Sequence, residues 1–276
     1  MKKWLFILLS VLLTTSCQQE QRSRKQTIAV TIEPLRWFTT RIVGDRYEVM
    51  TLVPAGSSPE TYEPTPRQLV TLSHSALYVK VGQIGFEQTW MDKIKENAPN
   101  LKILDSSKGI TPLKDHNGIE DPHTWMSCRN ARIIARNIYD EVMAQKGNSQ
   151  KDRDVFRKNY QALLHDIDET DRTIRKTITP GTSFLIYHPI LTYYAQEYGL
   201  TQLPMEEEGR EPSARQIEEL IREARKRKTR VMLIQQQFSP KNAMHMAEAT
   251  GAEPIEIHPL GSEWTKEMTE TAKKIK

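Results

Sequence analysis

The sequence predicts an α/β protein of two lobes, each with a parallel sheet flanked by helices, and the lobes joined by one long α-helix. In both halves of the chain, short runs rich in β-branched residues alternate with longer helix-like runs, which is typical of βαβ units. Between the halves, residues 152–178 contain no glycine or proline and place apolar residues on one helical face. A helix of this length spans about 40 Å, which is enough to join two lobes.

The first half, residues 27–150, is expected to form the N-terminal lobe. Its strands are built around valine, isoleucine and threonine, and the third ends directly before a glycine. Helix-like stretches lie between the strands, as parallel pairing requires. The predicted strands are Thr27–Glu33, Tyr47–Val53, Ala76–Val81 and Lys102–Asp105, and the predicted helices are Leu35–Val43, Thr65–Leu72 and Phe86–Asn97.

The linking helix is assigned to residues 151–179, and the C-terminal lobe to residues 180–276. Pro180 and Gly181 end the helix, because neither residue continues it well. An alternative stays open, in which the long helix belongs to one domain only. The second half then repeats the alternation, with strands Ser183–Tyr187, Leu200–Met205, Arg230–Gln235 and Glu253–Ile257 and helices Ile190–Tyr198, Ser213–Lys226, Pro240–Thr250 and Thr265–Lys276.

Residues 1–17 have the pattern of a secretory signal peptide and are not part of the fold. Two lysines precede a ten-residue apolar run that is too short to span a membrane, and small polar residues then lead to Cys17. This ending resembles a bacterial lipoprotein cleavage site, although Thr14 stands where leucine is usual. We expect lipidation at Cys17; the alternative is ordinary cleavage nearby. Residues 18–26 are all polar or charged and are expected to form a flexible tether.

The composition excludes several classes of protein. The 276 residues include 39 basic and 35 acidic side chains, a net charge of +4 that is far from a nucleic-acid-binding signature. A hydrophobic fraction of 38% with 27% charged residues argues against a disordered chain and against a polytopic membrane protein. Two cysteines are too few for a disulfide scaffold or a four-cysteine zinc ribbon.

Three of the seven histidines lie in unusual contexts next to proline. His123 lies in a Glu-Asp-Pro-His-Thr-Trp stretch, and His188 and His258 each follow a predicted strand, where open α/β sheets bind ligands. A proline-rich segment after the second strand, residues 54–66, carries Glu60. The spacings between these residues are wide, and neither HExxH nor CxxC occurs. From the residues alone, ligand roles and structural roles both stay open.

Five stretches of the mature chain, taken in order, decide between these roles: PAGSSPETYEPTP, EDPHTW, YHPILTYYAQEYGL, EEEGREPSARQIEELI and IHPLG. With them, the lipoprotein-like leader and the long central helix, the chain resembles the zinc/manganese substrate-binding proteins of bacterial ABC importers (cluster A-I, zinc-type). The resemblance covers essentially the whole mature chain. It implies the two-lobed fold and a metal site in the cleft between the lobes.

The resemblance also implies the ligand set. The family's usual first histidine is replaced by Glu60, His123 and His188 match two family histidines, and His258 stands where an aspartate is usual. Three imidazoles and one carboxylate remain, a set that suits four-coordinate zinc, whereas manganese prefers more oxygen ligands. The expected transported ligand is therefore zinc, with manganese as the alternative.

The expected function is that of a solute-binding protein, which is not an enzyme. It would capture a divalent metal and deliver it to a membrane permease and its ATPase. It is expected to be a monomer that binds no nucleic acid and is held by its lipid anchor in the periplasm or on the outer face of a bacterial membrane. The linking helix predicts small opening motions. The alternative is a secreted zinc-dependent hydrolase, with Glu60 as general base and an open coordination position.

Several other side chains carry weaker expectations. Trp125 is expected to pack beneath the site, and Cys128 to be a packing residue. His116 lies in a polar loop without a histidine-rich tract. The acidic run Glu206–Glu208 is expected to be a loop beside the second lobe's helix, with a position facing the cleft as the alternative.

Overall fold

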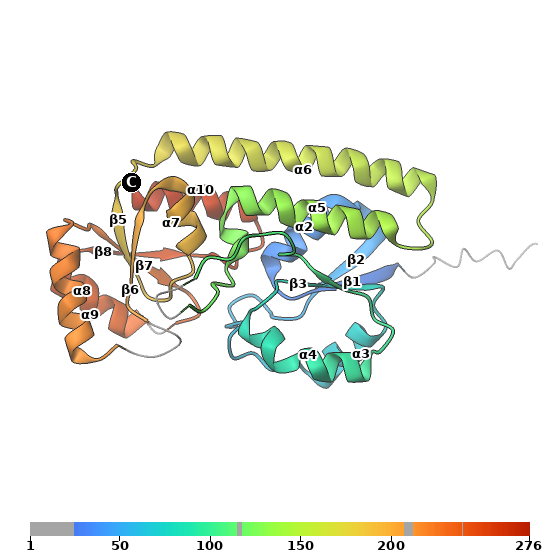
Figure 1. Cartoon of the computed structure of the whole chain (residues 1–276), viewed down its shortest axis with the longest axis horizontal. Helices are drawn as coiled ribbons and strands as arrows, with labels where there is room; N and C mark the ends of the chain where they lie inside the picture. The colour runs from blue at the N-terminus through green and yellow to red at the C-terminus, as the bar shows by residue number, and fades with distance from the viewer. Residues whose placement is uncertain (1–24, 115–117, 207–211, 239) are drawn as a thin grey trace, which may run out of the picture.

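Two four-stranded parallel sheets lie side by side, with strand orders β2-β1-β3-β4 and β6-β5-β7-β8 (Figure 1). The computed structural model describes residues 25–114, 118–206, 212–238 and 240–276. The predicted leader, Cys17, most of the tether, His116 and the end of the acidic run lie outside these residues. The two-lobed α/β fold with parallel sheets is confirmed. No helix in the described ranges is both long and apolar enough to cross a membrane.

The N-terminal sheet has its most apolar strands in the centre. Most residues of the middle strands β1 and β3 are buried, because helices cover both faces of a parallel sheet. Its strands are β1 (Gln26–Val30), β2 (Tyr47–Thr51), β3 (Leu77–Lys80) and β4 (Ile103–Asp105). Its helices are α2 (Glu33–Val43), α3 (Pro66–Ser73), α4 (Gly85–Asn97) and α5 (Cys128–Ala144), with short 3₁₀ turns η1 (Gly44–Arg46) and η2 (Thr124–Met126).

Helix α5 was not among the predicted elements. Ser127 caps it by accepting a hydrogen bond from the Asn130 backbone N–H. Its buried face alternates alanines with larger side chains, including Ile134 and Ile138. Its buried residues recur at helical spacing, as those of the linking helix do, so the sequence does carry a periodic signal for α5. Cys128 at its first turn is buried, and burial raises the pKa of its thiol above the ordinary range, which fits the expected packing role.

The linking helix is α6 (Gln150–Thr177), which runs along one side of the molecule past both sheets (Figure 1). It begins at a capping box between Ser149 and Asp152. Its buried side chains, among them Leu163 and Ile174, face α2 and α5 of the first half and α10 of the second. The helix is therefore packed against both halves.

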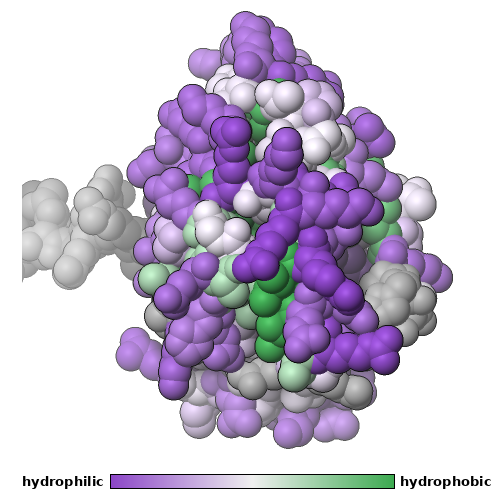
Figure 2. Space-filling view, turned by 90° about the vertical axis from the view of Figure 1, so that its left-hand side faces the viewer, coloured by the Kyte–Doolittle hydropathy of each residue, from purple (hydrophilic) through white to green (hydrophobic). Residues whose placement is uncertain are grey.

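The C-terminal sheet repeats the arrangement. Its strands are β5 (Ser183–Ile186), β6 (Thr201–Pro204), β7 (Val231–Gln235) and β8 (Glu253–Ile257), and its helices are α7 (Thr192–Tyr198), α8 (Ala214–Lys226), α9 (Pro240–Thr250) and α10 (Trp264–Ile275). Figure 2 views the molecule from the end that carries α8 and α9, where hydrophilic side chains surround a narrow apolar strip. Ile217, Leu220 and Ile221 of α8 are half-buried against the smaller of the two cores.

The larger core is continuous between the lobes. Trp264 of α10 is 1% exposed, and its ring centroid lies 5.1 Å from that of Phe38 on α2. Its indole N–H donates to the Trp125 backbone oxygen at 2.8 Å, and the Trp125 indole in turn donates to the Pro259 oxygen at 2.9 Å. These contacts tie the segment after His123 to the C-terminal lobe.

Candidate metal centre

Three of the predicted ligands meet between the lobes, each at the carboxyl end of a strand or in the loop beyond it. Glu60 lies in the loop after β2, His123 directly before η2, and His188 just after β5. One ligand atom from each lies within 4.8 Å of the others. Residues that are far apart in the sequence thus lie close together in space.

His123 is held by the residue two places before it. One Asp121 carboxylate oxygen accepts from the His123 backbone N–H at 2.8 Å and from its Nδ1–H at 2.9 Å. Burial acts to raise the pKa of Asp121, but the hydrogen bonds from His123 and Thr192 help to hold this pKa below its ordinary value. The His123 side chain is buried, and its ring packs edge-on against Trp125 at 5.4 Å, as expected for Trp125. The ring therefore has a fixed orientation, with Nε2 facing the cleft.

His188 is fixed by three neighbours. Its Nδ1 lies 3.2 Å from a carboxylate oxygen of Glu206, and its backbone oxygen accepts from the buried Gln235 amide at 2.6 Å. The ring of Phe238 stacks on the imidazole, with centroids 5.2 Å apart. Glu206 is itself buried. It contacts His188 directly, which corrects the expectation that it merely flanks a helix.

The two Nε2 atoms of His123 and His188 lie 3.2 Å apart. In the neutral tautomer that donates Nδ1–H to the carboxylate of Asp121 or Glu206, each imidazole carries a lone pair and no hydrogen on Nε2. Two such lone pairs repel each other at this distance unless a cation binds both. Two nitrogens bound to one tetrahedral zinc at about 2.0–2.1 Å lie about 3.3 Å apart, close to the observed spacing.

Glu60 provides the carboxylate of the group. One of its oxygens accepts a hydrogen bond of 3.1 Å from the Gly85 backbone N–H, at the first residue of α4. A helix N-terminus stabilises a negative charge. Glu60 is exposed, unlike the two imidazoles, so it forms the outer edge of the group.

His258, the fourth predicted ligand, does not join the group in this structure. Its Nδ1 lies 3.8 Å from a carboxylate oxygen of Glu256, and its side chain is 43% exposed. The residues after it do reach the site, because Leu260 lines the cavity between Glu60 and the two imidazoles. Its role as a ligand stays a prediction.

The cavity at the centre of the group measures about 20 Å³. This volume holds one water-sized particle and no organic molecule. Its walls include Trp125, Ile190 and Phe238, which keep bulk water away from the two imidazoles. The arrangement can hold a single bare cation with nitrogen and oxygen ligands.

A family model described as "Zinc-uptake complex component A periplasmic", ZnuA, matches residues 28–276 of the chain. The chain belongs to the ZnuA family. The high-affinity zinc uptake system protein ZnuA of Bacillus subtilis is 26% identical, over 94% of this chain and 89% of its own length. The zinc-binding lipoprotein AdcA of Streptococcus pneumoniae is 25% identical, over 92% of this chain and 54% of its own length. The manganese ABC transporter substrate-binding lipoprotein PsaA of Streptococcus mitis is 26% identical, over 84% of this chain and 80% of its own length.

Solved structures agree with this assignment to the ZnuA family. A crystal structure of ZnuA has a TM-score of 0.85 at 34% identity and covers 91% of this chain and 98% of its own. An Mn-bound periplasmic metal-binding protein from candidatus liberibacter asiaticus has a TM-score of 0.78 at 21% identity, with 91% and 98% covered, and so shares the fold. The named relatives are uptake and binding proteins, which leaves the hydrolase alternative without support.

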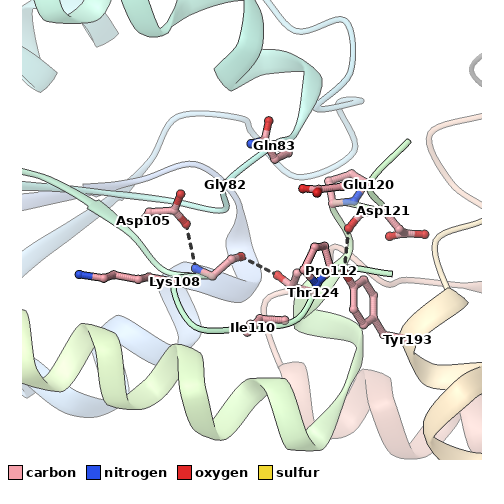
Figure 3. Close-up of a pocket in the computed structure, with 12 residues that line it drawn as sticks. Gly82, Gln83, Asp105, Lys108, Ile110, Pro112, Glu120, Asp121, Thr124 and Tyr193 are labelled. Atoms are coloured by element: carbon pink, nitrogen blue, oxygen red, sulfur yellow. Dashed lines mark hydrogen bonds between the residues drawn. The ribbon is translucent and has the colours of Figure 1, made fainter. Parts of the chain in front are cut away.

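A second cavity, of about 170 Å³, lies behind His123 in this ZnuA-family chain (Figure 3). The Tyr193 hydroxyl donates to the Asp121 backbone oxygen at 2.9 Å, and the Ser107 and Thr124 hydroxyls pair at 2.9 Å. These bonds hold the stretch on both sides of His123. Figure 3 shows Asp121 and Thr124 on the wall of this cavity.

Asp121 and Gln235 hold His123 and His188 in this ZnuA-family site by hydrogen bonds, and neither residue was predicted from the sequence. Asp121 leaves a local signal, because an aspartate two residues before a histidine can accept from that residue's backbone N–H in an Asx turn. Gln235 leaves none: it lies 47 positions from His188 and reaches it only because β7 pairs with β5.

Proposed function

We propose that this chain is the solute-binding protein of an ABC importer and captures zinc in the cleft between its lobes. The observation that carries the proposal is the pair of Nε2 atoms 3.2 Å apart, beside the carboxylate of Glu60. Membership of the ZnuA family supports it independently. The small cavity of about 20 Å³ favours a bare ion over a chelated one.

The donor set favours zinc over manganese. Zinc accepts two imidazoles, one carboxylate and a fourth ligand in tetrahedral geometry. Manganese prefers a larger number of oxygen ligands. The fourth ligand is His258, once its ring turns from Glu256 toward the cavity, or a water molecule.

Delivery requires a membrane partner. The chain hands the ion to a permease driven by an ATPase, outside the cytoplasm, in keeping with the family's description as a periplasmic component. We further propose that Cys17 carries the lipid anchor and that the chain acts as a monomer. AdcA and PsaA, which are named as lipoproteins, support the anchor.

Metal content tests this proposal. The chain without residues 1–17, incubated with equal zinc and manganese and then desalted, is expected to hold one zinc per molecule by mass spectrometry. His258→Ala separates the two candidates for the fourth ligand. If His258 coordinates the zinc, X-ray absorption will show one nitrogen ligand fewer in the variant than in the wild type; if water is the fourth ligand, the two spectra will agree. A chain that retains no metal contradicts the proposal.

Zinc delivery is tested in cells. Cells that lack the chain are expected to take up less radioactive zinc, and the wild-type chain should restore the uptake.

Removing the carboxylate behind His188 is expected to weaken zinc binding without abolishing it. Glu206→Ala frees the Nδ1 proton from its acceptor, so the ring loses both its orientation and part of its basicity. Such supporting residues typically contribute about 10–100-fold in metal affinity. Competition with a fluorescent chelator measures the change, and Glu218→Ala, an exposed glutamate on α8, is the control. Equal affinities in the two variants would remove Glu206 from the site.

A further inference from the structure

Glu60 and Gly85 lie so close together that position 85 has no room for a Cβ atom. A Cβ atom at position 85 would lie 2.4 Å from the Glu60 carboxylate oxygen Oε2, 2.9 Å from its backbone oxygen and 3.0 Å from its Cα. Real Cβ atoms do not approach neighbours within 3.0 Å. The carboxylate thus lies in the space that a side chain at position 85 would occupy.

Backbone conformation does not explain a glycine at this position. Gly85 is absent from the residues with positive φ, so the helix geometry alone would accept alanine there. Alanine is also the better helix former. Glycine at position 85 is required by the space that Glu60 takes.

The end of α4 is held firmly enough to position a neighbouring loop. The Phe86 backbone N–H donates to the Pro59 backbone oxygen at 2.8 Å, next to the Gly85–Glu60 bond. Glu87, buried one residue later, accepts from the backbone N–H groups of Val81 and Gly82 at 2.6 and 2.7 Å. The first turn of α4 is therefore anchored to the end of β3, and the Glu60 loop is anchored to that turn.

We propose that Gly85 is a positioning residue that makes Glu60 a one-oxygen ligand of the metal. Its N–H holds Oε2, which leaves Oε1 for the ion, and its missing side chain gives the carboxylate room. A carboxylate that binds through one oxygen suits four-coordinate zinc, whereas manganese gains from further oxygens. The inference rests on the proposed function, in which Glu60 is a ligand.

A double-mutant cycle tests the inference on the chain without residues 1–17. Zinc affinity is measured by chelator competition for the wild type, Gly85→Ala, Glu60→Ala and the double variant. We expect Gly85→Ala to weaken zinc binding about 10–100-fold when Glu60 is present, and to change it less than about twofold when Glu60 is alanine. Gln88→Ala, on the exposed side of the same turn, is the control and should leave affinity unchanged.

The other outcomes are distinguishable. A purely structural glycine predicts the same loss of affinity in both backgrounds, together with a lower melting temperature in both, and this result overturns the inference while leaving the proposed function intact. Zinc binding that is unaffected by Gly85→Ala overturns it in the same way. A wild-type chain that binds no zinc overturns the proposed function and the inference together. Manganese competition adds a second readout, because Gly85→Ala should lower the preference for zinc.

Discussion

Replacing both His123 and His188 by alanine is expected to weaken zinc binding by about 10⁴-fold. Four-ligand zinc sites bind with roughly 10–16 kcal/mol, so each imidazole contributes a few kcal/mol. Two lost ligands then amount to about 5–6 kcal/mol, at 1.4 kcal/mol for each tenfold change. Chelator competition at fixed pH measures the affinity, since zinc competes with protons for both rings.

The control for this variant removes two histidines that lie far from the cleft. His165 on α6 and His245 on α9 are both exposed, and we expect their double alanine variant to bind zinc as the wild type does. Both doubles lose two imidazoles, so a difference between them reports the position of the lost histidines and not their number. Zinc affinity that survives the loss of His123 and His188 would falsify the proposed site.

Trp264→Ala is expected to lower the free energy of unfolding by about 3–5 kcal/mol, the usual range for a buried aromatic side chain. The side chain is almost fully buried against Trp37 and Phe38, and its indole N–H donates to the Trp125 backbone oxygen. The substitution leaves a cavity between α10 and α2 and an unpaired carbonyl beside the metal site. Urea unfolding of the metal-free chain measures the loss of stability.

The matched control is Trp90→Ala on α4. Trp90 is half-buried, and its ring stacks with the Lys93 ammonium at the surface, so its removal should cost less than Trp264→Ala. Zinc affinity should also fall in Trp264→Ala, because Trp125 lies two residues after His123, but by less than in the double histidine variant. Equal unfolding free energies for the two tryptophan variants would show that the lobes are not held together through Trp264.

The sequence predicted the strands of both sheets and the linking helix well, because each has a strong local pattern. Glu60, His123 and His188 lie together in the structure, while their role as metal ligands stays a prediction. The family resemblance, rather than spacing, selected these residues from the other histidines and acids.

The remaining parts of the site depend on long-range geometry that no local pattern encodes. Glu206 meets His188 because its backbone N–H bonds to the Tyr187 oxygen, which aligns the ends of β6 and β5. The orientation of His258 is a choice between side-chain rotamers, one of which places Nδ1 3.8 Å from a Glu256 carboxylate oxygen. Gly85 is visible in the sequence, but its contact with Glu60 appears only once the loop and the helix are placed in space.

The exposure of Glu60 has a consequence for how long the ion stays bound. His123 and His188 lie behind Trp125 and Phe238, so solvent, a chelator or a docking protein reaches the ion first from the Glu60 side. With Glu60 as a ligand, as proposed, we expect the dissociation rate to depend on the movement of one loop rather than on separation of the lobes. Because this loop is anchored to the first turn of α4, a partner that breaks the contact between Glu60 and Gly85 gains access to an ion that would otherwise leave slowly.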